Sequence, residues 1–253
     1  MKKFIFLFPA MLMLAAAGCT APFEETVSPA DITVEQLESR MKQAMDPNGR
    51  FANAQTYIMR QQITTERGWM EPPQIQMVEV KFRRPDKFRL TTFTDNEPES
   101  AIIASGNRGW LVDLKRRKTV ALDSRMLPRV LAMVRLTNPG NNLKNVFDKV
   151  VLDRSRIDDE DFYRFTCSNG SNRPMHIYVG SNDFLNKRLR MKLDIGNTTL
   201  DYDSRMLCYS MYEGVMIPDE SVVVQGGTEQ RSKVIYYKLD ANIEDSEFQP
   251  PLF

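Results

Sequence analysis

The sequence predicts a mainly β protein with helices, built on one strongly curved antiparallel sheet whose concave face is covered by two helices. Three observations lead to this prediction. Most of the chain consists of short segments in which apolar and polar residues alternate, as in strands with one covered face. Two segments instead repeat apolar residues at helical spacing. About eleven strands would share one sheet, and a sheet of that size curls toward a barrel.

The composition is that of an ordinary globular protein and favours binding over catalysis. The 253 residues are 42% hydrophobic and 26% charged. Lys and Arg number 34 and Asp and Glu 33, which argues against a nucleic-acid binder with its usual basic excess. A single histidine, His176, and three cysteines exclude most multi-ligand metal sites and leave only one candidate for a histidine triad. No nucleophile elbow or acid pair stands out, so we expect no enzyme activity, catalytic residue, metal or cofactor.

The N-terminus has the features of a secretory signal peptide. Lys2 and Lys3 precede an apolar run from Phe4 to Ala17, which ends in small residues. A membrane-spanning helix needs about 20 apolar residues, so this run is too short to be a conventional membrane anchor. We therefore expect residues 1–18 to be a signal that is removed from the mature protein.

The end of this signal, Ala16-Ala17-Gly18-Cys19, resembles a bacterial lipobox, in which a peptidase cuts before the cysteine and lipid is attached to it. Cys19 is therefore the expected lipidation site, and residues 19–30 are the expected lipidated tether. Several acyl chains, such as palmitate, make such an attachment effectively permanent. Thr20 resembles the outer-membrane class of lipoproteins, so the expected location is the cell envelope, at the outer membrane facing the periplasm. The alternative is a generic signal cut near Ala17, with Cys19 incidental.

Residues 31–253 form the expected folded domain, which begins with a helix near Asp31. Thr33 and Gln36 fit a capping box at its start, and the turn residues at 46–49 end it. The apolar residues that recur at helical spacing are Val34, Leu37, Met41 and Met45.

From residue 51 to about residue 122 the pattern is one strand after another, beginning with a long segment over 51–66. Turn-like connections at 84–86 and 105–107 separate strands in which apolar and polar residues alternate. The alternating apolar side chains would line the concave face of the sheet and are the candidate ligand-binding residues. They are Val78, Val80, Phe82, Phe88, Leu90, Trp110, Val112 and Leu114.

A second helix is expected from Ser124 to about Leu136, and its apolar side is the candidate lid of the concave face. The lid residues at helical spacing are Leu127, Val130, Leu131 and Val134. A short helix at 142–147 follows. Further strands are expected over residues 162–167, 176–179, 185–194, 198–211, 220–224 and 233–239.

Cys167 and Cys208 fall in this second group of strands. An extracytoplasmic location permits a disulfide between them. Strands that meander in order would instead keep the two residues too far apart to bridge. The alternatives are therefore a disulfide or two small buried side chains.

The apolar residues of the sheet and the lid fit two hypotheses. They could enclose an apolar cavity in which an acyl chain is buried, at about 25 cal/mol per Å² of apolar surface. They could equally fill a packed core, because the same pattern builds any small barrel.

Several motifs resemble the LolA/LolB-like family of outer-membrane lipoprotein carriers and receptors. Residues 81–89 resemble its Arg-Pro-x-x-Phe-Arg hairpin, and residues 99–113 resemble the next hairpin, with a Gly turn before an aromatic strand. The mid-chain helices and residues 245–251 also resemble its pattern, so the resemblance covers roughly residues 31–253. It implies an unclosed β-barrel with a helical lid. It also implies that Arg84 matches the arginine that hydrogen-bonds the lid of the carrier and controls its opening.

The resemblance implies a lipid-anchored envelope protein that binds an acyl chain, a lipid or a lipoprotein, with a role in lipoprotein localisation to the outer membrane. The expected partners are acyl chains, the membrane through the N-terminal anchor, and other envelope proteins, but no nucleic acid. The alternative is a non-enzymatic scaffold or sensor module that uses the same fold for protein–protein interaction, with a filled core.

Overall fold

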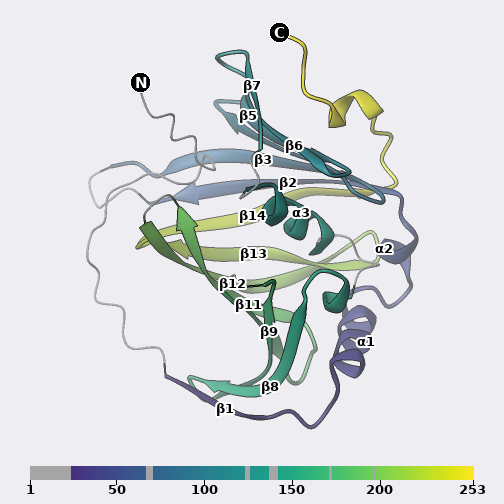
Figure 1. The fold of residues 1–253 in the computed structure, drawn as a ribbon, viewed down its shortest axis with the longest axis vertical. Helices are drawn as coiled ribbons and strands as arrows, with labels where there is room; N and C mark the ends of the chain where they lie inside the picture. Colours follow the sequence, from purple (N-terminus) through teal and green to yellow (C-terminus); the bar gives the residue numbers. More distant parts are fainter. Residues whose placement is uncertain (1–23, 67–70, 123–125, 137–141, 171–172, 196–197) are drawn as a thin grey trace.

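The computed structural model describes residues 24–66, 71–122, 126–136, 142–170, 173–195 and 198–253. Its main element is a sheet of fourteen strands in the order β1-β8-β9-β10-β11-β12-β13-β14-β2-β3-β4-β5-β6-β7 (Figure 1). The strands are β1 (Glu25–Pro29), β2 (Thr56–Thr65), β3 (Gln74–Arg83), β4 (Lys87–Thr94), β5 (Glu97–Ser105), β6 (Arg108–Asp113), β7 (Lys118–Ala121), β8 (Lys149–Ile157), β9 (Glu160–Ser168), β10 (Met175–Gly180), β11 (Asn186–Ile195), β12 (Thr198–Tyr212), β13 (Val215–Gln225) and β14 (Thr228–Leu239). The helices are α1 (Val34–Met45), α2 (Arg50–Asn53) and α3 (Met126–Leu136), with short 3₁₀ turns η1 (Leu143–Asn145) and η2 (Asp245–Phe248).

The sheet consists of two meanders, β2 to β7 and β8 to β14, which are joined where β14 pairs with β2. Every strand pair is antiparallel, and β1 and β7 are the two edges of the sheet. The sheet is strongly curved but its edges do not meet, so the prediction of a curved, unclosed antiparallel sheet is confirmed. None of the helices within the described ranges is long and apolar enough to cross a membrane.

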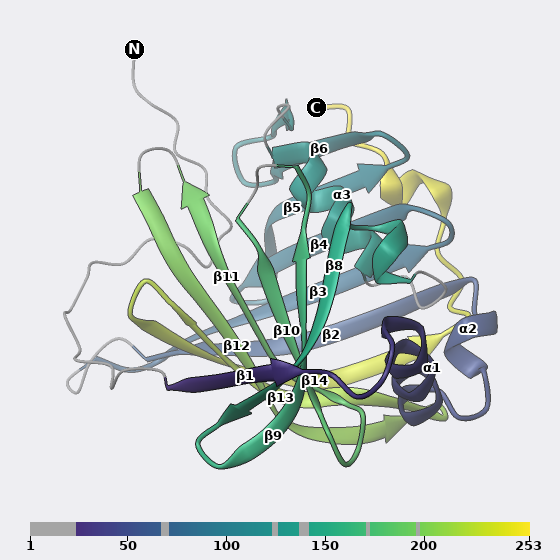
Figure 2. The same cartoon turned by 60° about the horizontal axis from the view of Figure 1, so that its bottom comes forward.

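The helices α1 and α3 lie on the concave side of the sheet (Figure 2). Helix α3 contributes to two buried apolar clusters. Val130 and Leu131 pack against the cluster formed by β2 to β5, β13 and β14, whereas Ala132 and Leu136 pack against the cluster formed by α1 and β9 to β10. Helix α3 therefore lies between the two halves of the curved sheet and contacts both.

Helix α1 begins where the capping box predicts. The Thr33 hydroxyl accepts a hydrogen bond from the Gln36 amide at 3.2 Å, and the Gln36 side chain accepts one from the Thr33 amide at 2.9 Å. The helix ends at Asp46, as predicted from the turn residues that follow. Leu37, on its apolar side, is completely buried against the sheet.

The folded domain begins earlier in the chain than predicted. Glu25–Pro29, which the sequence analysis assigned to the tether, form the edge strand β1 and pair with β8. Alternation gives no signal here, because four of the five residues are exposed. The strand is held through Glu25, whose carboxylate accepts hydrogen bonds from Ser155 Oγ at 2.6 Å and from Arg164 at 3.1 Å.

Three further expectations need correction or completion. The segment predicted as a strand from residue 51 begins with the short helix α2, and β2 starts only at Thr56. Strand β8 was not predicted. Cys167 is buried and Cys208 is exposed, and both are free thiols. They lie on β9 and β12 with two strands between them, so a disulfide between them is excluded. The alternative prediction, two small buried side chains, is confirmed for Cys167 and wrong for Cys208.

The C-terminal segment crosses the convex side of β3 to β5 as the turn η2 (Figure 1). Its acidic side chains meet the basic residues of the sheet. Lys81 Nζ lies 2.8 Å from Glu247, and Lys87 Nζ lies 3.0 Å from Asp245. The hydrogen bond from Lys87 lowers the pKa of the Asp245 carboxyl. Phe248 is 1% exposed beneath this turn. The C-terminal segment thus pairs the cations that these strands direct away from the concave side.

Candidate functional site

The concave side of the first meander carries a continuous apolar surface, which we call the concave apolar face. Successive strands place matching residues side by side, because alternate side chains of a strand point to the same side. One row runs from Phe82 to Phe88 and Ala104, and the next row runs from Val80 through Leu90 and Ile102 to Leu111. The face comprises Tyr57, Met59, Val78, Val80, Phe82, Phe88, Leu90, Ile102, Ala104 and Leu111, with Val215, Ile217, Val234, Tyr237 and Leu239 from the second meander.

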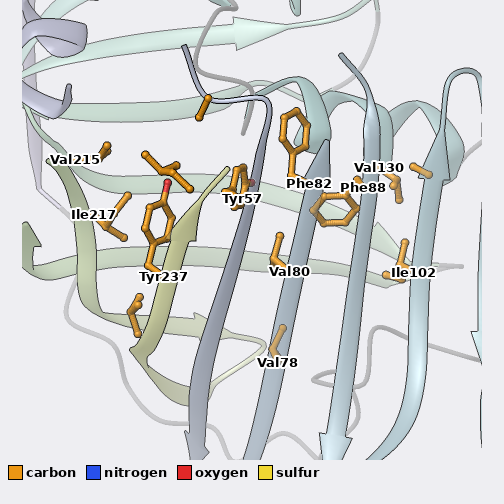
Figure 3. Close-up of a cluster of buried hydrophobic side chains, with 14 residues drawn as sticks. Tyr57, Val78, Val80, Phe82, Phe88, Ile102, Val130, Val215, Ile217 and Tyr237 are labelled. Carbon is orange, nitrogen blue, oxygen red and sulfur yellow. The ribbon is translucent and has the colours of Figure 1, made fainter. Parts of the chain in front are cut away.

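Aromatic rings lie at the end of this face that is formed by the start of β2 and the end of β3. Tyr57 stacks on Phe82, with ring centroids 5.2 Å apart, and on Tyr237, with centroids 6.0 Å apart. Phe51 of α2 meets Tyr57 edge-on at 5.7 Å. Figure 3 shows Phe82 and Phe88 on neighbouring strands, pointing to the same side of the sheet as Val130 of α3.

Helix α3 covers one end of the concave apolar face. Val130 is 4% exposed and belongs to the same cluster as Phe82, Phe88 and Ile102. Gly109 of β6 permits the close approach of the helix, because a Cβ atom there would lie 3.0 Å from Leu127 Cδ1 and 2.7 Å from Leu122 Cδ1. The helix therefore buries part of the concave apolar face.

The structure brings five of the eight predicted face residues together and separates the other three from them. Val78, Val80, Phe82, Phe88 and Leu90 lie on the concave apolar face. Trp110, Val112 and Leu114 instead form a separate cluster with Ala101 and Ile103.

The register of β6 explains this separation. Leu111 pairs with Ile102, and the pair lies on the concave side, so Trp110 and Val112 point to the other side of the sheet. Trp110, Leu111 and Val112 are consecutive apolar residues, and alternation cannot assign a side to such a run. Leu111 and Ile102 are face residues that sequence reasoning missed, and only the register identifies them.

Of the predicted lid residues, Val130 and Leu131 pack on the concave apolar face, and Leu127 lies in the first turn of α3 next to Gly109. The side chain of Val134, the cap Ser124 and the predicted lipidation site Cys19 lie outside the described part of the structure.

Arg84 holds backbone carbonyl groups, as a latch would, but on a different element from α3. Its Nε donates to the carbonyl of Ala54 at 2.7 Å, and its Nη2 donates to the carbonyls of Phe51 at 3.1 Å and Ala52 at 2.9 Å. These groups belong to the end of α2, whose last carbonyls have no partner within the helix. Arg84 therefore fixes α2, and with it the Phe51 ring, beside Tyr57 at the border of the concave apolar face.

Other titratable residues are placed away from this face. His176 lies on β10 with its Nδ1 3.2 Å from the Thr166 hydroxyl, and burial lowers the pKa of its imidazole. The acidic run 158–161 covers the turn between β8 and β9 and the first two residues of β9, and the basic run 115–118 covers the turn between β6 and β7 and the first residue of β7. Among the described residues, no three His, Cys, Asp or Glu side chains are grouped to hold a metal ion.

The comparisons with known proteins support the fold. No family model matches the chain, and no curated protein sequence matches it. A LolA superfamily protein from Nitrosomonas europaea is similar in structure, with 15% identity over 86% of this chain and 98% of that chain and a TM-score of 0.57. A DUF1329 family protein from Desulfovibrio piger is similar with 11% identity, 85% and 95% coverage and a TM-score of 0.57.

A putative outer membrane lipoprotein-sorting protein domain from Vibrio parahaemolyticus is similar with 10% identity, 85% and 97% coverage and a TM-score of 0.55. At these identities the likeness concerns the fold. The chain therefore has a LolA-like fold. This confirms the architecture that the motifs at 81–89 and 99–113 predict.

We predict that Arg84→Leu lowers the free energy of unfolding by about 1–3 kcal/mol, because three carbonyl groups at the end of α2 lose a charged donor. Urea denaturation measures this change. The control is Arg231→Leu, which removes an exposed arginine from β14 and should change stability by less than about 0.5 kcal/mol. Equal effects of the two substitutions would contradict the assignment of Arg84 to α2.

Proposed function

We propose that the protein is a non-enzymatic, lipid-anchored envelope protein that binds the acyl chain of a lipid or lipoprotein on the concave apolar face. The observation that carries this proposal is that α3, a helix of 11 residues, covers an apolar surface that the curved sheet builds independently of it. Helices of this length are marginal in water unless they pack on something else. Helix α3 therefore depends on the same surface that a ligand would occupy.

Binding would be an exchange of one apolar partner for another. An acyl chain gains about 0.8 kcal/mol for each methylene group that it buries. It must first displace Val130 and Leu131, which cover the face in this structure. The loss of the contacts between α3 and the sheet offsets part of this free energy. The ligand is therefore bound less tightly than its buried apolar area alone would predict. Such an exchange suits a protein that has to release its ligand to an acceptor.

The similar structures support this proposal at the level of the fold, because they include a LolA superfamily protein and a putative lipoprotein-sorting domain. The second candidate function is a scaffold or sensor that binds envelope proteins and keeps its core filled. The observation that favours it is the near-complete burial of Val130 against Phe82 and Phe88. The two candidates differ in whether α3 leaves the sheet when an acyl chain arrives.

We predict that Val130→Ala strengthens the binding of a fluorescent acyl probe while it destabilises the free protein. The substitution removes contacts that hold α3 on the face and should lower the free energy of unfolding by about 1–3 kcal/mol. The same contacts compete with the probe, so the apparent dissociation constant should fall about fivefold for each 1 kcal/mol lost by the covered state. Probe titration and urea denaturation measure the two effects.

The matched control is Val112→Ala, which removes the same atoms from a completely buried valine in the separate cluster on the other side of the sheet. It should destabilise the protein without strengthening probe binding. If Val130→Ala weakens probe binding, or if neither protein binds the probe, the face is a permanent core and the scaffold function is favoured.

The proposed anchor is lipid on Cys19, at the outer membrane facing the periplasm. Strand β1 begins at Glu25, and its carboxylate joins it to Arg164 and Ser155. A chain of roughly six residues reaches at most about 20 Å. The edge of the sheet formed by β1 would therefore stay close to the membrane surface.

We predict that Cys19→Ser moves the protein from the membrane fraction to the soluble periplasmic fraction, because the thiol that would carry the lipid is lost. Cell fractionation followed by immunoblotting measures the distribution. Cys208→Ser, at an exposed thiol of β12, is the control and should leave the protein in the membrane fraction. Continued membrane attachment of the Cys19→Ser protein would contradict the lipid anchor.

A further inference from the structure

The concave side of the sheet changes from apolar to uncharged polar residues along the strands. We call the polar part the neutral band, and it consists of Gln61, Gln76, Thr92, Ser221, Gln225 and Ser232. Strand register places these side chains on the concave side. Thr92 pairs with Val78 and Val78 with Gln61, while Gln76 pairs with Ile63 and Ile63 with Ser232.

The neutral band adjoins the concave apolar face. Val78 and Val234 belong to the apolar cluster, and Ile63 packs against it. Gln61 pairs with both of the valines across the strands β3 and β14. Ser232 pairs with Ser221, and their hydroxyl groups are 2.7 Å apart. A molecule that lies along the strands from the apolar face would therefore reach the band next.

The five strands that carry the neutral band hold almost no charge on the concave side. Further along the sheet, the row of Thr92 continues through Ser100 of β5 to Asp113 of β6 and Lys118 of β7. On β2, β3, β4, β13 and β14, the described positions that share the concave side hold one charged residue, Asp219. The Tyr212 hydroxyl donates a hydrogen bond to the Asp219 carboxylate, and this hydrogen bond raises the pKa of Tyr212 to about 12. The cations of these strands occupy positions of the opposite side. They are Arg60, Lys81, Arg83, Lys87, Arg89, Arg231, Lys233 and Lys238.

Three buried polar atoms on the concave side have no hydrogen-bond partner among the described residues. They are Thr92 Oγ1, Gln225 Nε2 and Tyr237 Oη. Thr92 is 2% exposed and Tyr237 is 8% exposed, so water reaches neither freely. A buried polar group without a partner costs about 1–3 kcal/mol. Thr92 and Gln225 belong to the neutral band, where a ligand that offers hydroxyl, carbonyl or amide groups would remove that cost, whereas Tyr237 belongs to the concave apolar face.

We infer that the neutral band binds the uncharged, hydroxyl- or amide-bearing head group of an acylated ligand whose hydrocarbon chain lies on the concave apolar face. This inference rests on the proposed function. The band supplies hydroxyl and amide groups that donate and accept hydrogen bonds with such a head group. A carboxylate or phosphate would be buried with no cation beside it and with Asp219 on the same side, which is costly.

The test compares three ligands that share a palmitoyl chain and differ in the head group. They are 1-palmitoylglycerol, palmitate, and palmitoyl lysophosphatidylglycerol, each measured by displacement of a fluorescent acyl probe from the purified protein at pH 8. We expect 1-palmitoylglycerol to displace the probe at a concentration at least about tenfold lower than either anionic ligand, which corresponds to about 1.4 kcal/mol.

A variant that places a cation in the band should reverse this preference. Gln61→Lys should improve the displacement by palmitate about tenfold relative to 1-palmitoylglycerol. The matched control is Gln62→Lys, because Gln62 is the next residue of β2 and points to the opposite side of the sheet, beside Lys233 and Met77. The control should leave the order of the three ligands unchanged.

Equal displacement by the three ligands, or a preference for an anionic one, would overturn the inference about the head group while leaving acyl binding intact. A reversal by Gln62→Lys as large as that by Gln61→Lys would also overturn it. If none of the three ligands displaces the probe or binds the protein, the proposed function itself fails.

Discussion

The packing of α3 onto the concave apolar face is the interaction on which the account depends. A sheet of fourteen strands curves but does not close, and its concave side therefore needs a cover. Val130 and Leu131 supply that cover on one half of the sheet, and Ala132 and Leu136 pack on the other half. Because one short helix contacts both halves, its displacement would uncover a large apolar surface without breaking any strand pair.

The distribution of charge makes the two sides of the first meander chemically different. Arginines and lysines of β3 and β4 point outward, where Asp245 and Glu247 of the C-terminal segment pair with them. The concave side keeps apolar residues at one end and uncharged polar residues such as Gln76 and Thr92 at the other. Burial of an unpaired charge is expensive, so this segregation favours the folded state, and it would also select uncharged ligands in the proposed site.

The sequence predicts the architecture better than it predicts the composition of the site. The capping box of α1 and the alternation in β3 and β4 are local signals, and the structure confirms both. Residues 110–112 are three consecutive apolar residues, so the sequence does not indicate which side of β6 faces α3. The register of β6 with β5 shows which side it is. Strand β1 lacks a hydrophobic pattern because Glu25 holds it at an exposed edge. The carbonyl partners of Arg84 lie at the end of α2, and this four-residue helix is too short to show a helical repeat in the sequence.

Hydrogen–deuterium exchange of α3 tests the central claim most directly. The amides of residues 126–136 would be followed in the free protein and at saturation with a fluorescent acyl probe, with those of β3 and β4 as the internal reference. The account predicts that α3 exchanges faster when the probe is bound, because the helix has left the sheet, while β3 and β4 stay protected. Protection of α3 that stays equal to that of β3 and β4, with and without the probe, would show that the helix is a permanent part of the core and would contradict the account.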